Sequence, residues 1–212
     1  MKKGKLIVLE GIDGCGKSTN VPIVQSILRE LGVPSIATAE PGGTDLGRTL
    51  RGWIKTGNHD FSPEVLTMLM CTARLHHIEK VIKPVLNNGI AVVCDRYWSS
   101  TIAYQQIGMG VDGDDIIKIG ELFNFSDYEP DLELYLKVPY TTTFARRGSN
   151  KDYFDSQGKD FFNKVTTAYD LIAKEVEFIE TIDATKSLAN VQSQIRQELY
   201  KLYPSKCGLQ IK

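Results

Sequence analysis

LIVLEGIDGCGKST, residues 6–19, is the stretch of sequence that decides the fold. Its first five residues, largely apolar, predict a buried strand, and the rest matches the phosphate-loop pattern G-x-x-x-x-G-K-[ST]. Glycines let successive backbone N–H groups turn toward a phosphate, and the helix that follows adds partial positive charge. We therefore expect Lys17 to reach the outer phosphates of a bound nucleotide and Ser18 to bind Mg²⁺. The residues expected to bind the nucleotide are Gly11, Ile12, Asp13, Gly14, Cys15, Gly16, Lys17, Ser18 and Thr19.

Outside this stretch, short apolar runs alternate with longer segments of helical spacing, a pattern typical of a parallel sheet connected by helices. It predicts strands at Leu6–Glu10, Val33–Thr38, Ile90–Asp95, Leu132–Val138 and Ile179–Asp183. Helices are predicted over Ser18–Leu31, from the cap Ser62 to about Asn88, and from about Ser187 to Tyr203. The expected fold is α/β, a five-stranded parallel sheet of the P-loop NTPase type with helices on both faces and a short lid.

Length and composition favour one domain, here of the P-loop type, over residues 1–212. Within it, the polar, glycine-bounded stretch at 148–158 is the expected lid. The net charge of −1 gives no sign of a nucleic-acid surface, and no run approaches the roughly 18 apolar residues of a membrane span. The chain has 4 cysteines without metal-ligand spacing, which indicates a reduced, cytoplasmic setting.

The end of the third predicted strand offers the second half of a site. IAVVCDRY, residues 90–97, places Asp95 at the carboxyl edge of the sheet, where ligands bind in such folds. Asp95 is expected to hold Mg²⁺ directly or through water, and Arg96 to clamp a second anionic group with its planar guanidinium. A salt bridge at the strand end is the structural alternative. These residues alone predict a P-loop phosphotransferase or hydrolase whose acceptor is unknown.

Three further stretches narrow the acceptor: EPGGT at 40–44, followed by Arg51, then DRY at 95–97 and STIAYQ at 100–105. In this order and spacing they resemble the thymidylate kinase family of the bacterial type, and the resemblance extends from Lys5 to about Gln197. The family implies transfer of the γ-phosphate of ATP to the 5′-phosphate of dTMP, with Mg²⁺, giving dTDP for DNA precursor synthesis. It also implies a homodimer packed through the long helices.

The resemblance implies roles for the residues around the acceptor phosphate. Asp13 would face the acceptor sugar, while Arg96 and Arg51, with Glu40, would position the monophosphate for in-line attack. A loop-stabilising aspartate is the alternative interpretation of Asp13. On the donor side, Asp183–Thr185 resembles the loop near the adenine of ATP.

Other matched positions concern the base and the sugar of the acceptor. Arg74 and Thr101, with Gln105, resemble the residues that read the edge of the thymine ring. Tyr104 resembles the tyrosine that packs where a ribose 2′-hydroxyl would sit, which favours deoxynucleotides. Thr101 and Tyr104 have an alternative interpretation as ordinary helix and core residues.

One departure from the family concerns the choice of base. Four positions before Arg74, where the family usually has a phenylalanine that stacks on the pyrimidine, this chain has Met70. Methionine is apolar and adaptable but lacks the flat ring. An alternative function is therefore a kinase for another deoxypyrimidine monophosphate, such as dUMP or a 5-substituted dUMP.

A second departure concerns the charge on the transferred phosphoryl group. The family places a catalytic arginine either in the phosphate loop, where this chain has Gly14, or in a lid motif D-R-x-E, where it has DYFD at 152–155. Such an arginine is worth several powers of ten in rate. The nearest substitutes are Arg146, Arg147 and Lys151, and a catalytically weak nucleotide-binding relative is a further alternative. The expected catalytic residues are Lys17, Asp13, Arg96, and Arg147 or Lys151.

Overall fold

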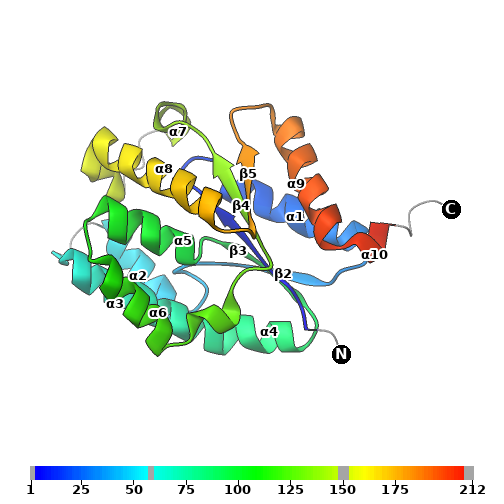
Figure 1. Cartoon of the computed structure of the whole chain (residues 1–212), viewed down its shortest axis with the longest axis horizontal. Coiled ribbons are helices and arrows are strands. Elements are labelled where there is room, and N and C mark those ends of the chain that lie inside the picture. Colours follow the sequence, from blue (N-terminus) through cyan, green and yellow to red (C-terminus); the bar gives the residue numbers. More distant parts are fainter. Residues whose placement is uncertain (1–2, 57–59, 148–152, 208–212) are drawn as a thin grey trace.

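The computed structural model describes residues 3–56, 60–147 and 153–207, which are built around a parallel five-stranded sheet (Figure 1). Its strands are β1 (Leu6–Glu10), β2 (Ser35–Ala39), β3 (Ala91–Asp95), β4 (Leu132–Lys137) and β5 (Ile179–Asp183). They lie in the order β2-β3-β1-β4-β5. The predicted α/β sheet is confirmed, and each predicted strand end lies within two residues of the observed one.

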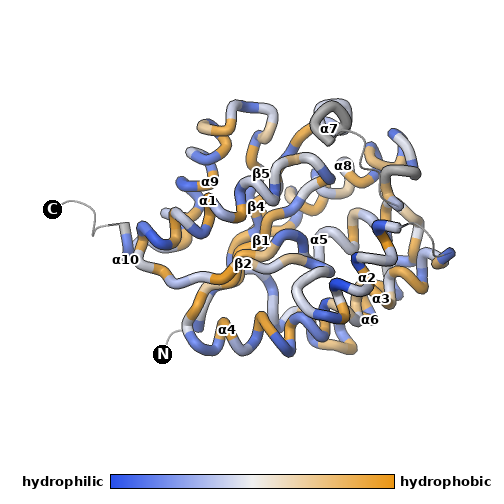
Figure 2. Tube along the Cα trace, turned by 180° about the vertical axis from the view of Figure 1, so that it is seen from behind, coloured by the Kyte–Doolittle hydropathy of each residue, from blue (hydrophilic) through white to orange (hydrophobic). Residues whose placement is uncertain are grey.

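Helices cover both faces of the sheet, which is why its strands are apolar on both sides (Figure 2). On one face, Ile7 and Leu9 of β1 share a buried cluster with α1 (Lys17–Glu30), α8 (Gly158–Glu175) and α9 (Leu188–Leu202). On the other face, Leu6 and Val8 pack with the long helix that contains Ile82. Because β1 is the central strand, the loop that follows it lies in the middle of the carboxyl edge of the sheet.

The long helix starts and ends close to where the sequence predicts. Its first part is α3 (Pro63–His77), and the Ser62 hydroxyl caps it by accepting a hydrogen bond from the backbone N–H of Val65. The helix continues through π-helical turns at Ile78–Ile82 into α4 (Lys83–Asn87). Gly89, with φ of +74°, then ends it in the left-handed conformation that favours glycine.

Several helices were not identified from the sequence. They are α2 (Asp45–Thr56), α5 (Trp98–Thr101) with its π-helical continuation Ile102–Gly108, α6 (Gly113–Leu122), α7 (Tyr140–Arg147), α8 and the short α10 (Pro204–Cys207). Of the expected lid, residues 148–152 lie outside the described residues, and a 3-10 turn at Phe154–Gln157 leads into α8. None of the described helices is long and apolar enough to cross a membrane.

Three cysteines in the described part of the chain are free and buried: Cys15, Cys71 and Cys94. Burial raises the pKa of each thiol, so these side chains remain protonated near neutral pH. A thiol in this state is a poor nucleophile. We therefore treat Cys15, although it belongs to the phosphate loop, as a packing residue beneath that loop.

Candidate active site

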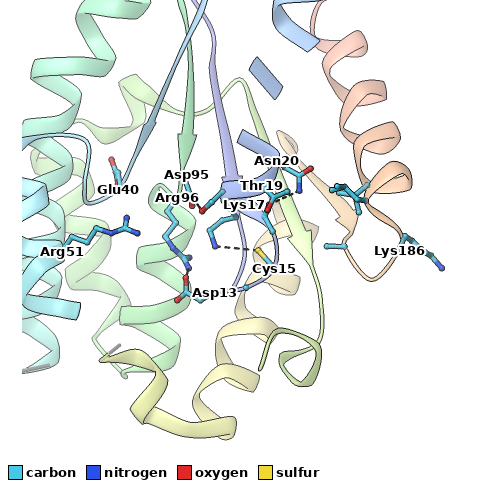
Figure 3. A pocket seen from close by; sticks show the side chains of 16 residues that line it. Asp13, Cys15, Lys17, Thr19, Asn20, Glu40, Arg51, Asp95, Arg96 and Lys186 are labelled. Carbon is cyan, nitrogen blue, oxygen red and sulfur yellow. Dashed lines mark hydrogen bonds and ion pairs between the residues drawn. The ribbon is translucent and has the colours of Figure 1, made fainter. Parts of the chain in front are cut away.

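The loop between β1 and α1 borders a cavity of about 460 Å³ at the carboxyl edge of the sheet (Figure 3). Gly11 has a φ of +131°, and a Cβ there would lie 2.8 Å from the carbonyl oxygen of Leu136, so the position requires glycine. Lys17 is buried, and its Nζ donates to the carbonyl oxygens of Gly11 and Ile12 at 2.9 and 3.3 Å. The ammonium group is thereby held inside the curve of the loop.

The two predicted metal ligands lie side by side. Ser18 Oγ, in the first turn of α1, donates a hydrogen bond to Asp95 Oδ2, at the end of β3, over 3.1 Å. Two adjacent ligands of an octahedral Mg²⁺, each about 2.1 Å from the metal, are about 3.0 Å apart. The pair therefore fits Mg²⁺. No group of three or more His, Cys, Asp or Glu side chains suited to a metal occurs among the described residues, so further ligands would be phosphate oxygens and water.

Arg96 lies between the two halves of the site. Its φ of +74° places the backbone in the left-handed region, which is uncommon for a residue with a Cβ and points to a functional constraint. Its Nη2 donates to Asp13 Oδ1 at 2.6 Å and its Nη1 to the carbonyl oxygen of Gly11 at 3.0 Å. Burial by itself would lower the pKa of Arg96, but Asp13 and other neighbours raise it well above its usual range. The guanidinium is therefore a fixed positive charge beside the phosphate loop.

A carboxylate beneath Arg96 orders this region, and the sequence analysis did not identify it. Glu10, the last residue of β1, is fully buried. It accepts hydrogen bonds from the backbone N–H groups of Tyr97 and Ser100, from Ser100 Oγ and from Tyr169 Oη, at 2.6, 3.2, 2.7 and 2.8 Å. Those two hydroxyls lie 3.1 and 3.4 Å from Arg96 Nη1. The sequence signal for this role was that a charged residue, Glu10, ends an otherwise apolar strand.

A second cavity, of about 100 Å³, adjoins the first. Four of the predicted site residues line both cavities: Asp13, Glu40, Arg51 and Arg96. Arg51 extends from α2 toward Arg96 in Figure 3, and its guanidinium forms no hydrogen bond or ion pair with another described residue. Two cations, Arg51 and Arg96, therefore lie where the cavities meet.

The smaller cavity brings together three residues predicted to contact the acceptor: Met70, Tyr104 and Gln105. Tyr104 Oη lies 3.4 Å from Arg96 Nη2. Gln105 is 1% exposed, and its Nε2 has no hydrogen-bond partner in the part of the chain that the structure describes. A buried polar group without a partner costs about 1–3 kcal/mol, so a carbonyl group bound in this cavity would relieve that cost.

Arg74 and Thr101, also expected beside the base, are buried and are not among the described residues that line this cavity. Arg74 donates through Nη1 to Thr101 Oγ1 at 2.7 Å and through Nη2 to the carbonyl oxygen of Tyr97 at 2.8 Å. Its Nε donates to Glu40 Oε2 at 2.7 Å, while Glu40 Oε1 lies 3.1 Å from Nδ1 of His77. Both carboxylate oxygens of Glu40 are therefore engaged inside the protein.

The side chains expected to replace the missing arginine are not among those that the structure describes. Lys151 falls in the segment 148–152, outside the described residues, and the side chains of Arg146 and Arg147 at the end of α7 are not described either. On the donor side, Ala184 of the predicted adenine loop lines the larger cavity, as do three residues that the sequence analysis did not name, Lys186, Leu188 and Val191. The basic residues that line the two cavities in the described part of the chain are Lys17, Arg51, Lys55, Arg96 and Lys186.

Comparison with known proteins gives the same family that the motifs suggest. A family model described as thymidylate kinase matches residues 9–195. A thymidylate kinase of Neisseria gonorrhoeae (strain NCCP11945) is 39% identical over 200 residues, covering 93% of this chain and 97% of the relative. Thymidylate kinases of Fervidobacterium nodosum and Legionella pneumophila (strain Corby) are 37% and 39% identical and cover 89% and 91% of this chain, and 95% and 92% of those relatives. A match of this extent, on a chain that carries the phosphate loop, means that the protein is an enzyme of the thymidylate kinase family.

Proposed function

We propose that this enzyme transfers the γ-phosphoryl group of ATP to the 5′-phosphate of dTMP, giving dTDP. The observation that carries the proposal is the wall shared by the two cavities, formed by Asp13, Glu40, Arg51 and Arg96. ATP in the larger cavity and a monophosphate in the smaller one would meet beside the two arginines. The relatives' names support dTMP as the acceptor and do not favour the alternatives of another deoxypyrimidine kinase or a catalytically weak protein.

On the donor side, the backbone of residues 11–19 would bind the phosphates of ATP. Lys17 would leave the carbonyl groups that it now contacts, because a phosphate is a stronger partner for an ammonium group than a neutral carbonyl. Ser18 and Asp95 would hold Mg²⁺, the first directly and the second directly or through water. When bound, Mg²⁺ neutralises charge on the transferring phosphates.

On the acceptor side, the enzyme does not need a general base. A phosphate monoester is largely dianionic at pH 7, so its attacking oxygen already lacks a proton. The task is to bring this anion close to the γ-phosphate, and Arg96 and Arg51 are the charges available at the junction of the cavities. Asp13 would face the sugar while fixing the orientation of Arg96 through their ion pair.

Base recognition would depend first on Gln105. Its unpaired Nε2 suits the 4-carbonyl oxygen of thymine, and the oxygen of the same amide suits the neighbouring N3–H. Tyr104 and Met70 would contact the sugar and the ring. Because Arg74 is tied to Glu40 and Thr101, we propose that Glu40 acts by holding Arg74, and that Arg74 and Thr101 reach the base only if their buried contacts rearrange.

The charge that develops on the transferred group needs one more cation near the larger cavity. We propose Arg147 or Lys151 for this role, with Arg146 as the remaining candidate. Alanine substitutions at the three positions, made separately and together, test it, and unchanged turnover in the triple variant would reject it.

The setting of the enzyme is also proposed. A single kinase domain acting in the cytoplasm on ATP and a deoxypyrimidine monophosphate, without a nucleic-acid or membrane partner, fits the composition. Two apolar side chains on α3, Val65 and Met68, are 47% and 49% exposed and support a homodimer packed through the long helices. Light scattering that gave the mass of one chain would rule out the dimer.

The experiment that tests the proposed reaction measures ADP release with Mg-ATP against dTMP, dUMP, 5-hydroxymethyl-dUMP, dCMP, dGMP and UMP, with a control that lacks acceptor. We expect the highest kcat/KM with dTMP. A higher kcat/KM with another pyrimidine would overturn dTMP as the substrate and make Met70 the first position to vary. No turnover with any acceptor, despite nucleotide binding, would overturn the kinase reaction itself.

A further inference from the structure

The smaller cavity, called the acceptor cavity from here on, contains an aromatic residue, Phe154, to which the sequence analysis assigned no role. Phe154 lines it together with Met70, Tyr104 and Gln105, although it lies about 50 residues further along the chain than Gln105. Phe154 is 7% exposed and begins the 3-10 turn that leads into α8. The residues that line this cavity therefore come from the loops after β1, β2 and β3, from α2, α3 and α5 with its continuation, and from the turn before α8.

Rings from two other elements hold Phe154 in place. Its centroid lies 5.0 Å from that of Tyr104 at an interplanar angle of 75°, an edge-to-face contact. On α8, the ring of Phe161 lies 6.1 Å away at 18°, and it also contacts Tyr104 at 6.0 Å and 64°. The neighbouring residue, Tyr153, donates its backbone N–H to the carbonyl oxygen of Ile54, another residue that lines the cavity. Phe154 is thus fixed against both α2 and α8.

The chemistry of the cavity explains what this ring is for. Gln105 offers hydrogen-bonding groups to the edge of a base, which leaves the faces of the base to apolar neighbours. Met70 is apolar, but its side chain lacks a ring and has three rotatable bonds. It therefore contacts a bound base without a fixed geometry. An aromatic neighbour adds about 0.5–1.5 kcal/mol beyond its buried area. Phe154 and Tyr104 are the aromatic residues among the described residues of this wall, and Tyr104 Oη is directed to Arg96.

We propose that Phe154 is a specificity-determining residue, the aromatic wall of the subsite that binds the pyrimidine of the acceptor. This inference rests on the proposed function, since it names how the same acceptor site holds its base. The inference explains why position 70 can be a methionine instead of an aromatic residue. The ring is provided from the start of α8, and Met70 fills the remaining space beside the base.

The test compares Phe154→Leu with Phe123→Leu, a control at a half-buried phenylalanine in the cluster on the other face of the sheet. Steady-state kinetics give KM for dTMP and for ATP in each variant. In Phe154→Leu we expect KM for dTMP to rise roughly 2- to 12-fold, the range that an aromatic contact of this kind is worth, with KM for ATP essentially unchanged. In Phe123→Leu both constants should stay near those of the parent enzyme.

A second variant separates a lost ring from a disturbed fold. Adding Met70→Phe to Phe154→Leu places a new ring in the same cavity, and we expect it to recover most of the lost acceptor affinity. If Phe154→Leu does not fold, Phe154→Met, which keeps more of the side-chain volume, is measured in its place. An unchanged KM for dTMP, or equal rises in both KM values without recovery by Met70→Phe, would overturn the inference. If the parent enzyme itself does not use dTMP, the proposed function has failed, and Phe154 is then tested with the acceptor that it does use.

Discussion

Arg96 shows how many contacts a single side chain makes in this site. Its Nη1 contacts the carbonyl oxygen of Gly11 and two hydroxyl groups, and its Nη2 contacts Asp13 and Tyr104 Oη. A guanidinium can do this because its donors spread over a rigid plane, whereas an ammonium group is a point charge on a flexible stem. The backbone at Arg96 also carries an unusual φ of +74°, so the surrounding structure must hold it in place.

At this scale we predict the effect of Arg96→Lys. The positive charge remains, but the fork that contacts both Asp13 and the hydroxyl groups is lost, so the acceptor phosphate should be poorly positioned. We expect kcat/KM for dTMP to fall by about 10²-fold or more, with KM for ATP nearly unchanged. Arg196→Lys is the matched control, because Arg196 pairs with Glu30 in a partly exposed ion pair and lines neither cavity. Similar kinetics in the two variants would show that charge alone is sufficient at position 96.

Among the elements, the start of α5 is the one on which the site depends most. Three hydrogen bonds to Glu10 fix residues 97–100, and a fourth comes from Tyr169 on α8. Residues 97–100 join β3 to the helix that carries Thr101, Tyr104 and Gln105. The network therefore links the central strand to the acceptor cavity. Because Glu10 is fully buried, each of these donors has greater energetic weight than it would have in water.

The prediction for this element concerns Tyr169→Phe, which removes one donor to Glu10 and one neighbour of Arg96 without changing the shape of the ring. We expect kcat/KM for dTMP to fall roughly 5- to 30-fold and stability to fall by about 1–2 kcal/mol. The control is Tyr135→Phe, since Tyr135 stacks on Tyr169 at 5.2 Å but donates to Asp170 instead. The positioning role would be contradicted if both variants lost stability equally and neither lost activity toward dTMP.

The elements also show what the sequence could and could not reveal. The five strands, the Ser62 cap and the phosphate loop were predictable because each depends on neighbours within a few residues. The contacts of Glu10 with Tyr169 and of Arg74 with Glu40 join residues 159 and 34 positions apart, and no local pattern encodes them. The same holds for Phe154, whose place in the acceptor cavity depends on the packing of α8 against the continuation of α5.

At the scale of the whole molecule, the sheet buries two carboxyl groups, Glu10 and Glu133, that have different numbers of hydrogen-bond partners. Glu10 accepts four hydrogen bonds, whereas Glu133, in β4, accepts one from Ser99 at 3.0 Å on Oε2. Glu133 Oε1 has no partner within the described part of the chain. Burial, and then the proximity of Glu10, raise the pKa of Glu133 well above its usual range. The folded protein therefore keeps a proton at Glu133 at pH values where the unfolded chain has lost it.

Because the folded protein binds this extra proton, its stability depends on pH. When the folded state binds more protons than the unfolded state, stability falls as pH rises, from the ordinary pKa of a glutamate toward the raised pKa of Glu133. Glu133→Gln removes the proton and the pH dependence but keeps the size of the side chain. We expect the variant and the parent to have similar Tm values near pH 4.5, and the variant to gain on the parent as pH rises to 8. Each kcal/mol that ionised Glu133 costs the folded parent is worth roughly 2–4 °C of Tm in a chain of this size.

Thermal unfolding followed by circular dichroism across that pH range measures the gain directly. The matched variant is Glu129→Gln, because Glu129 lines the same cavity as Glu133 but is exposed to solvent, so this change removes a carboxyl group from the region without removing a buried one. A constant difference between Glu133→Gln and the parent from pH 4.5 to 8 would mean that Glu133 is as easily ionised in the folded protein as in the unfolded chain. The unpaired Oε1 would then have to be hydrated, since an ionised carboxylate in the sheet needs partners for both of its oxygens.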